Sequence, residues 1–278
     1  MKIVDSASFF LDHYKADTKF LKEYYNKYNN IFSEYFKYHC KDSEERQLQS
    51  LHKYSLSTLK KVHDNIIPVI KETVNTYNTL YRIAFPIDVN LIIGQYGSNA
   101  YTHRQIIPNI TFALERLSPN KNYLKVIVAH EFGHAAHNIL TDQVGYDWSE
   151  MQWDNPLIWL YQEGIATHFS RKISPNLPPH TYFSYNDEGA DWLAFCKENK
   201  SKIKQQFTLD LTNEKINDVF YEWFSIRGGE KFGHNRLGYF IGDLFVQEQI
   251  QSFGEMKTIT FWKETQFIDY VRKWLQDN

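Results

Sequence analysis

Two histidines and a glutamate in the segment 130–134 have the types and spacing of a metal-dependent catalytic group. The segment reads His130-Glu131-Phe132-Gly133-His134. On a helix, residues four positions apart lie on one face about one turn apart, so the imidazoles of His130 and His134 can bind a single tetrahedral zinc ion. Glu131 is offset by one position, which places its carboxylate beside the metal. There it can take a proton from a zinc-bound water, whose pKa the metal lowers toward about 7.

The sequence around this segment predicts a buried helix. Between residues 123 and 140, apolar side chains occupy nearly every face, and ionisable groups inside such a helix cost free energy unless something compensates them. A metal ion would compensate His130, Glu131 and His134. Gly133 lowers helix stability, which indicates that another backbone approaches closely at this point. A catalytic zinc also needs a third protein ligand and an open fourth position.

A second apolar helix is predicted at 156–171, and it contains the phrase Trp-Leu-Tyr-Gln-Glu-Gly-Ile-Ala at 159–166. The HExxH segment followed by this WLxxEGxA phrase resembles the gluzincin metallopeptidases, the group that contains thermolysin and the zinc aminopeptidases. Their third ligand is the glutamate of the second helix, so the resemblance implies that Glu163 completes the ligands of one zinc ion per chain. The intervening stretch 135–162 is longer than in those enzymes. The length of this stretch is more similar to that in a family of bacterial predicted Zn-dependent proteases. It leaves room for an inserted loop around residues 146–148.

Two histidines are weighed against Glu163 as the third ligand. His137 follows His134 by three residues, but on a continuous helix it points away from the predicted metal face. A metzincin pattern would need glycine at position 137 and histidine at position 140, where the chain has His137 and Leu140, so that pattern fails. His168 lies on the predicted helix of Glu163, but five residues away it faces elsewhere.

Peptide hydrolysis also needs a group that stabilises the tetrahedral oxyanion. The resemblance implies a tyrosine or histidine from the C-terminal helical part, and the segment 232–242 offers both His234 and Tyr239. Arg236 in the same segment is expected to bind a substrate carboxylate. The alternative is that Tyr239 packs in the core and that His234 caps a loop. Tyr146 is a weaker alternative donor.

The strand before the metal helix has a second implied use. In gluzincins this strand is a sheet edge that pairs with extended substrate, so the resemblance assigns substrate binding to the strand 109–114, which begins at Asn109. Pro108 independently favours an edge position, because proline cannot donate to a sheet. Glu115 follows the strand, and the zinc aminopeptidases use a glutamate near this edge to bind a substrate amino terminus. The surrounding phrase does not match their motif, so a solvated side chain is the favoured interpretation of Glu115.

The remaining pattern places these residues in an α+β fold that is mostly helical. Apolar and aromatic positions at three- and four-residue steps predict helices over residues 1–85, and Pro68 is expected to kink or end one of them. A short β-branched run closed by glycine predicts a strand at 89–94, and another strand is predicted at 106–114. Polar residues and a proline at 118–120 predict the start of the metal helix. Further helices are predicted at 156–171, 186–206, 213–225 and 235–252.

Composition limits the classes of function. The formal net charge is −2 and no polybasic segment occurs, which argues against a nucleic-acid partner. The first residues contain no apolar signal segment, and no run of about 18 apolar residues predicts a membrane span. Cys40 and Cys196 are the only cysteines and have no CxxC spacing. A disulfide framework is therefore not expected, and a cytoplasmic location is favoured.

Together these patterns predict a helical N-terminal region over residues 1–85 and a thermolysin-like zinc peptidase domain over 86–278, with a small mixed sheet and an active-site helix. The expected activity is hydrolysis of a peptide or protein substrate by a zinc-activated water, with Glu131 as the general base. A regulatory or scaffold protein that binds zinc without hydrolysis is the alternative. An enzyme that uses the same zinc on a non-peptide substrate is a third option. The sequence does not distinguish an endopeptidase from an aminopeptidase.

Overall fold

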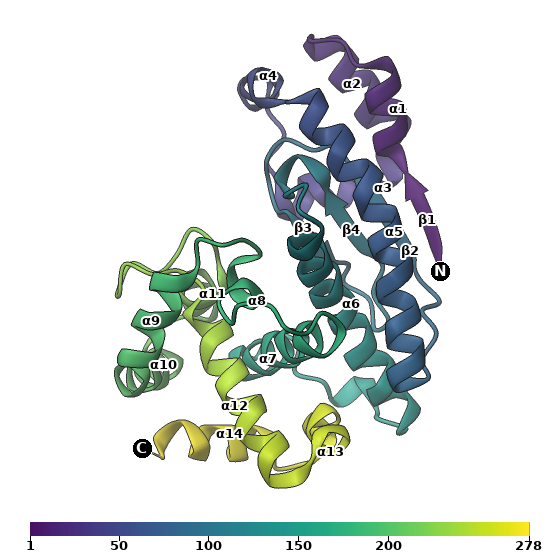
Figure 1. Ribbon diagram of the computed structural model, residues 1–278. Helices are drawn as coiled ribbons and strands as arrows, with labels where there is room; N and C mark the ends of the chain where they lie inside the picture. The colour runs from purple at the N-terminus through teal and green to yellow at the C-terminus, as the bar shows by residue number, and fades with distance from the viewer. Residues whose placement is uncertain (278) are drawn as a thin grey trace. The chain divides into compact units, whose positions relative to one another are not determined.

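The computed structural model describes residues 1–277 of the chain. The chain forms two compact units, which divide at the step from Glu131 to Phe132. The first unit contains a four-stranded sheet with several helices, and the described part of the second consists of helices and loops (Figure 1). The expected α+β class, mostly helical with a small mixed sheet, is therefore confirmed.

The sheet has the strand order β1-β2-β4-β3. Strands β1 (Lys2–Asp5), β2 (Asp88–Ile92) and β4 (Ile110–Ala113) run parallel, and β3 (Ala100–Thr102) pairs antiparallel with β4. All four residues of β4 are buried, as are the last four of β2. Such continuous burial is typical of parallel strands that are covered on both faces. The strands predicted at 89–94 and 106–114 are confirmed, although the second is shorter than expected.

Strand β1 was not predicted, because residues 1–85 were expected to be helical throughout. The strand pairs with β2 in a register that runs from Lys2 opposite Asp88 to Asp5 opposite Leu91. The rest of the region is helical as expected, and the predicted boundary near residue 85 stays a prediction. Its elements are α1 (Ser6–His13), α2 (Thr18–Lys27), α3 (Asn29–Glu34), a π-helical turn at Tyr35–His39, α4 (Glu44–Lys53) and α5 (Leu56–Tyr81).

Pro68 lies inside α5 and does not end the helix, which continues to Tyr81. A proline in a helix interior costs about 3 kcal/mol. Each fully buried aliphatic side chain contributes about 1.5–3 kcal/mol in the opposite direction. Burial along one face of α5 therefore outweighs the cost of the proline. The buried residues of that face are Leu59, Val62, Ile66, Val69, Ile70, Thr73 and Tyr77.

Glu115 holds the loop that follows β2. It lies in a short 3-10 helix (Leu114–Arg116) directly after β4. Its carboxylate accepts hydrogen bonds from the backbone N–H of Gly94 at 2.9 Å and of Tyr96 at 3.1 Å. Burial raises the pKa of Glu115 to about 7, although the two backbone N–H groups act in the opposite direction. The interpretation of Glu115 as a solvated side chain is therefore wrong.

Three helices carry the candidate site. Helix α6 (Lys121–Gln143) starts where it was predicted, directly after residues 118–120, and it continues from the first unit into the second. Helix α7 (Pro156–Ile173) begins at a proline that is capped by Asn155, whose side chain accepts from the N–H of Leu157 at 3.0 Å. Helix α12 (Leu237–Phe253) packs against α7 (Figure 1).

Glycines allow α7 to approach both neighbouring helices closely. A Cβ atom on Gly133 of α6 would lie 3.0 Å from the Cα atom of Ala166 on α7. A Cβ atom on Gly164 of α7 would overlap the carbonyl oxygen of Gly242 on α12. The close backbone approach that was expected at Gly133 is therefore confirmed, and a second, tighter one occurs beside Glu163.

Among the remaining helices of the second unit, those at 190–198 and 200–213 divide the segment predicted at 186–206, and the one at 216–224 matches the segment predicted at 213–225. The helices at 181–184, 255–259 and 267–276 were not predicted. The remaining helices are α8 (Thr181–Ser184), α9 (Ala190–Glu198), α10 (Lys200–Asn213), α11 (Ile216–Phe224), α13 (Glu255–Ile259) and α14 (Phe267–Gln276). Among the described residues, no helix combines the length and apolarity that a membrane span requires. Cys40 and Cys196 are both buried free thiols.

Replacement of Glu115 by glutamine should remove part of the pH dependence of stability. The folded-state pKa of about 7 lies above the ordinary value of 4.5, so folding favours the protonated carboxyl. Its stabilising contribution is present below pH 4.5 and is lost as the pH rises toward 7, by a total of about 3 kcal/mol. Urea unfolding at pH 5 and pH 8 should therefore show a smaller loss of unfolding free energy in Glu115→Gln than in the unaltered protein.

Glu23 is exposed, and Glu23→Gln provides the matched control, which should follow the unaltered protein. If Glu115→Gln lost as much unfolding free energy between the two pH values as the control, the conclusion that burial raises the pKa of Glu115 would be contradicted.

Candidate metal centre

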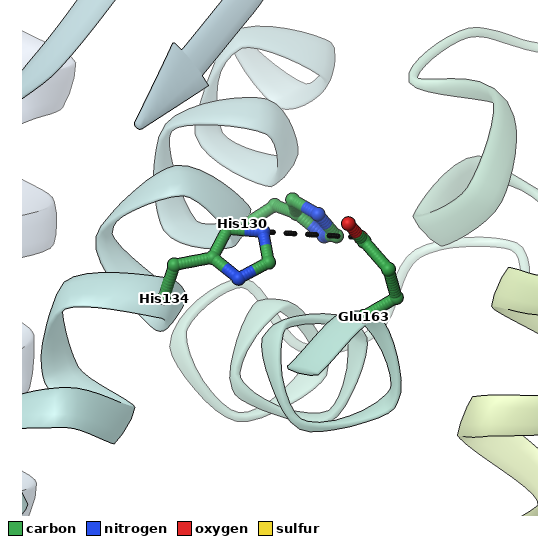
Figure 2. A group of neighbouring side chains, drawn as sticks. All are labelled: His130, His134 and Glu163. Atoms are coloured by element: carbon green, nitrogen blue, oxygen red, sulfur yellow. Dashed lines mark ion pairs between the residues drawn. The ribbon is translucent and has the colours of Figure 1, made fainter. Parts of the chain in front are cut away.

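The structure gathers His130, His134 and Glu163 into one group. The two histidines lie one turn apart on α6, and the glutamate projects toward them from α7 (Figure 2). One ligand atom from each residue can be chosen so that all three atoms lie within 4.8 Å of one another. The Nε2 atom of His134 lies 3.8 Å from a carboxylate oxygen of Glu163. These three residues are the ones that the sequence analysis assigned to the metal.

The donor set and its spacing fit a small metal ion. Two imidazole nitrogens and one carboxylate oxygen are typical protein ligands of a catalytic zinc, which binds them at about 2.0–2.2 Å. Donors around such a tetrahedral ion lie about 3.4 Å apart, so small side-chain adjustments would bring the three groups to that spacing. His130 is only 2% exposed. The side chains of His134 and Glu163 are 14% and 18% exposed, so the group is partly accessible.

Packing fixes both helices near the group. Tyr77 of α5 donates a hydrogen bond at 2.7 Å to the carbonyl of Ala129, the residue before His130. Tyr161, two residues before Glu163, is fully buried and donates to the carbonyl of Thr258. Both tyrosines tie a helix to a neighbouring element within two residues of a ligand. The positions of the ligands therefore depend on buried contacts as well as on the helices themselves.

Glu131 lies next to His130 on α6 and is 8% exposed. A step of one residue rotates a side chain by about 100° around the helix axis, so Glu131 projects to the side of the face that carries the two histidines. It is not a member of the group of three potential ligands. This placement agrees with a carboxylate that lies beside the ion rather than on it.

The two rival histidines have other contacts and lie outside the group. The ring of His137 stacks on Trp262 with centroids 3.8 Å apart and meets Tyr161 edge-on. Burial and the neighbouring His134 hold the pKa of His137 well below its usual range, so its ring is neutral at physiological pH. His168 lies 2.7 Å from a carboxylate oxygen of Glu255 on α13. Neither histidine belongs to the predicted metal group.

The segment 232–242 lies at the start of α12, as predicted. His234 stacks on Phe195 of α9 with ring centroids 4.1 Å apart, and it lies in the loop before the helix. Tyr239 lies in the first turn of α12 and is half-buried. The guanidinium of Arg236 lies over the Tyr239 ring, 5.5 Å from its centroid. His234 and Tyr239 therefore occupy different surroundings, and the structure places only Tyr239 on α12.

The expected edge position of the strand 109–114 is wrong. Strand β4 lies between β2 and β3, and β3 is the outer strand on that side of the sheet. Pro108 is compatible with this interior position because it precedes the paired residues of β4 and thus removes no ladder bond. Asn109 has a structural contact, since its side chain accepts a hydrogen bond from the N–H of Asp88 at 2.8 Å.

Two aromatic residues, one beside Arg236 and one beside His137, have no signal in the sequence. Tyr185 lies beside Arg236, 5.9 Å from ring centroid to guanidinium carbon, and Trp262 covers His137. Both lie far from their partners in sequence, and neither has a local pattern that would reveal the contact. Tyr146, the weaker oxyanion candidate, packs edge-on against Trp148 in the loop between α6 and α7. That loop lies within the stretch 135–162, whose length left room for an inserted loop.

Removal of any one ligand should abolish tight metal binding. We expect His130→Ala, His134→Ala and Glu163→Ala each to weaken zinc binding by more than about 100-fold, since even the loss of an outer partner of a ligand typically costs 10–100-fold. His137→Phe keeps a flat ring against Trp262 and should retain zinc affinity within about threefold. Titration of zinc against a chromogenic chelator measures all four variants. Equal losses in His137→Phe and His134→Ala would contradict the assignment.

Comparison with known proteins gives no family assignment. No model of a known protein family matches the chain, and neither a curated protein nor a solved structure matches it. The functional interpretation therefore depends on the chain's own residues and on the geometry of the group on α6 and α7.

Proposed function

We propose that this protein is a zinc-dependent peptidase of the gluzincin type, with zinc held by His130, His134 and Glu163. The observation that carries the proposal is the convergence of these three ligands from α6 and α7, with Glu131 directly beside His130. Two histidines four residues apart on a helix, with a glutamate directly after the first, form the HExxH arrangement of zinc peptidases. The group that the sequence predicts is the one whose ligand atoms lie together.

The choice of metal follows from the neighbours of the ligands. A pair of histidines with one carboxylate is also used by ferrous oxygenases. Those sites do not require a carboxylate base next to the first histidine on the same helix, whereas hydrolysis does. Glu131 therefore favours zinc. Bound zinc would supply a Lewis acid for the peptide carbonyl and a water of lowered pKa.

The chain's own residues supply the proton transfers. Glu131 takes up the proton that leaves the attacking water, and it then delivers that proton to the nitrogen of the leaving amine. Its low exposure of 8% limits competing contact with solvent. The carbonyl carbon gains the hydroxyl oxygen as the peptide C–N bond breaks, so the products are one carboxylate and one amine.

Tyr239 is the stronger candidate for the oxyanion donor. It shares a face of α12 with Gly242 and Val246, at the i, i+3 and i+7 positions. Both of those residues contact Gly164 of α7, which follows Glu163 directly. Tyr239 therefore lies on the side of α12 that faces the helix of the third ligand. The ring of His234 is instead stacked on Phe195.

The number of ligands supports hydrolysis over a purely structural role. A structural zinc site has four protein ligands, and a catalytic one has three and an open position. Within residues 1–277 the group contains three ligand residues.

Replacement of the base should separate catalysis from metal binding. We expect Glu131→Gln to keep zinc and to lose peptidase activity by about 100- to 10 000-fold, because general acid–base catalysis contributes about that much. His130→Ala should lose both zinc and activity. A diverse peptide mixture incubated with and without a zinc chelator, with mass spectrometry as the readout, measures the activity.

The exposed Glu188 supplies the control variant, and Glu188→Gln should cleave like the unaltered protein. Cleavage that persists in Glu131→Gln would exclude the proposed mechanism. The absence of chelator-sensitive cleavage of any peptide by the unaltered, zinc-loaded protein would favour the non-hydrolytic alternative.

A second pair of variants tests the oxyanion donor. Tyr239→Phe removes one hydroxyl and should lower kcat by about 100- to 1000-fold, with little change in KM, because the lost hydrogen bond forms only as charge develops on the substrate. His234→Phe keeps a ring that can stack on Phe195, and it should change kcat by less than about threefold. Steady-state kinetics on one cleaved peptide gives both values. The opposite ranking would assign the role to His234.

A further inference from the structure

Arg236 is a half-buried cation without an internal anion. Its guanidinium lies over the rings of Tyr185 and Tyr239, 5.9 Å and 5.5 Å from their centroids. Its Nε atom is buried and has no hydrogen-bond partner. Within residues 1–277, no carboxylate lies within ion-pair distance of Arg236. A buried, unpartnered donor on a charged group is costly, so the arrangement is suited to a partner that arrives from outside.

A second arginine of the same unit shows what is missing at Arg236. The guanidinium of Arg171 also lies over two aromatic rings, those of Tyr182 and Phe183, at 5.4 Å and 5.6 Å. Unlike Arg236, it donates to both oxygens of the Asp243 carboxylate. The two arginines therefore share an aromatic support, and one of them has a bidentate carboxylate partner. No carboxylate of the described residues occupies the matching position at Arg236.

The surroundings of Arg236 add to its preference for an anion. Arg236 is the residue before α12, a helix of 17 residues whose N-terminus has no side-chain cap. The free N–H groups at a helix N-terminus carry partial positive charge and favour a carboxylate. Aromatic faces hold the guanidinium in place, which leaves its planar fork available for two parallel hydrogen bonds.

The position of Arg236 relates it to the candidate metal centre. Arg236 lies six positions before Gly242, which contacts Gly164 beside Glu163. At a rise of 1.5 Å per residue, that separation is about 9 Å along α12. Extended peptide spans about 3.3–3.6 Å per residue, so two or three residues of substrate are as long as this part of α12.

We propose that Arg236 binds the C-terminal carboxylate of peptide substrates, so that the enzyme releases short fragments from the carboxyl end of a chain. The inference rests on the proposed function for the cleavage itself, but the carboxylate site is defined by Arg236, Tyr185 and the start of α12. It selects a substrate class, free peptide carboxyl termini, which the metal ligands alone do not select.

The test measures binding separately from cleavage. The zinc-loaded Glu131→Gln protein is titrated with one unstructured hexapeptide in two forms, a free C-terminal carboxylate and the C-terminal amide, by calorimetry. We expect the free acid to bind at least about tenfold more tightly, as a charge-assisted bidentate pair would give. Equal affinity for the two peptide forms would overturn the inference, and this comparison needs no variant at Arg236.

Variants at Arg236 locate the effect. Adding Arg236→Gln to the Glu131→Gln protein should reduce the preference for the free acid to less than about twofold. Arg236→Lys should keep part of the preference, because the lysine ammonium still attracts a carboxylate as a point charge. Arg227→Gln changes an exposed arginine of the preceding loop and should leave the preference intact. A preference that survives in Arg236→Gln, or that disappears equally in Arg227→Gln, would contradict the assignment. If Arg236→Gln fails to fold, as judged by circular dichroism, the lysine variant carries this comparison.

Cleavage by the unaltered protein distinguishes failure of this inference from failure of the proposed function. Free-acid peptides should yield C-terminal fragments of two or three residues, and amidated peptides should be cleaved at least about tenfold more slowly. Equal cleavage of both forms leaves the peptidase proposal intact and overturns the carboxylate site. Binding that depends on Arg236 without any cleavage supports the carboxylate site and overturns the peptidase. Inorganic phosphate serves as a competitor for binding of the free-acid peptide. If phosphate displaced that peptide and the free acid bound no more tightly than the amide, Arg236 would be a general anion site and the inference would be overturned.

Discussion

The backbone of helix α7 packs closely against both α6 and α12, and the candidate metal centre depends on this packing. The contacts are made by glycines, Gly133 against Ala166 and Gly164 against Gly242. A side chain at either glycine would push the helices apart and would move Glu163 away from His130 and His134. Burial of ionisable groups in an apolar helix is costly unless they have a partner. The same packing that buries these groups also brings them within reach of one another.

The parts of the site that follow from local geometry could be predicted from the sequence. The relation between His130 and His134 depends only on helical periodicity, and the apolar surroundings of the segment 130–134 indicated its burial. Gly133 was correctly expected to mark a close backbone approach. Glu163 lies 29 residues after His134, and no periodic pattern connects them. Its assignment as a ligand came from the resemblance of a short phrase, and the structure places its carboxylate near the two histidines.

The errors occurred where structure depends on distant partners. Strand β1 has four residues, too few for an alternating pattern to be distinguished from a helix start. Pro108 suggested an edge strand, but proline removes no ladder bond when it lies two positions before the first paired residue. Glu115 has no local signal for its role, because the N–H groups of Gly94 and Tyr96 reach it only after β2 and β4 have paired.

The contact between Gly164 and Gly242 has a mechanical consequence. Side chains at a helix interface can change rotamer and let two helices slide, whereas a seam of backbone atoms has no such freedom. Leu160 reinforces the seam, since its carbonyl oxygen occupies the space beside Gly242. Helices α7 and α12 should therefore move together as one rigid body. Any relative movement of other elements should then leave the relation between Glu163 and Tyr239 unchanged.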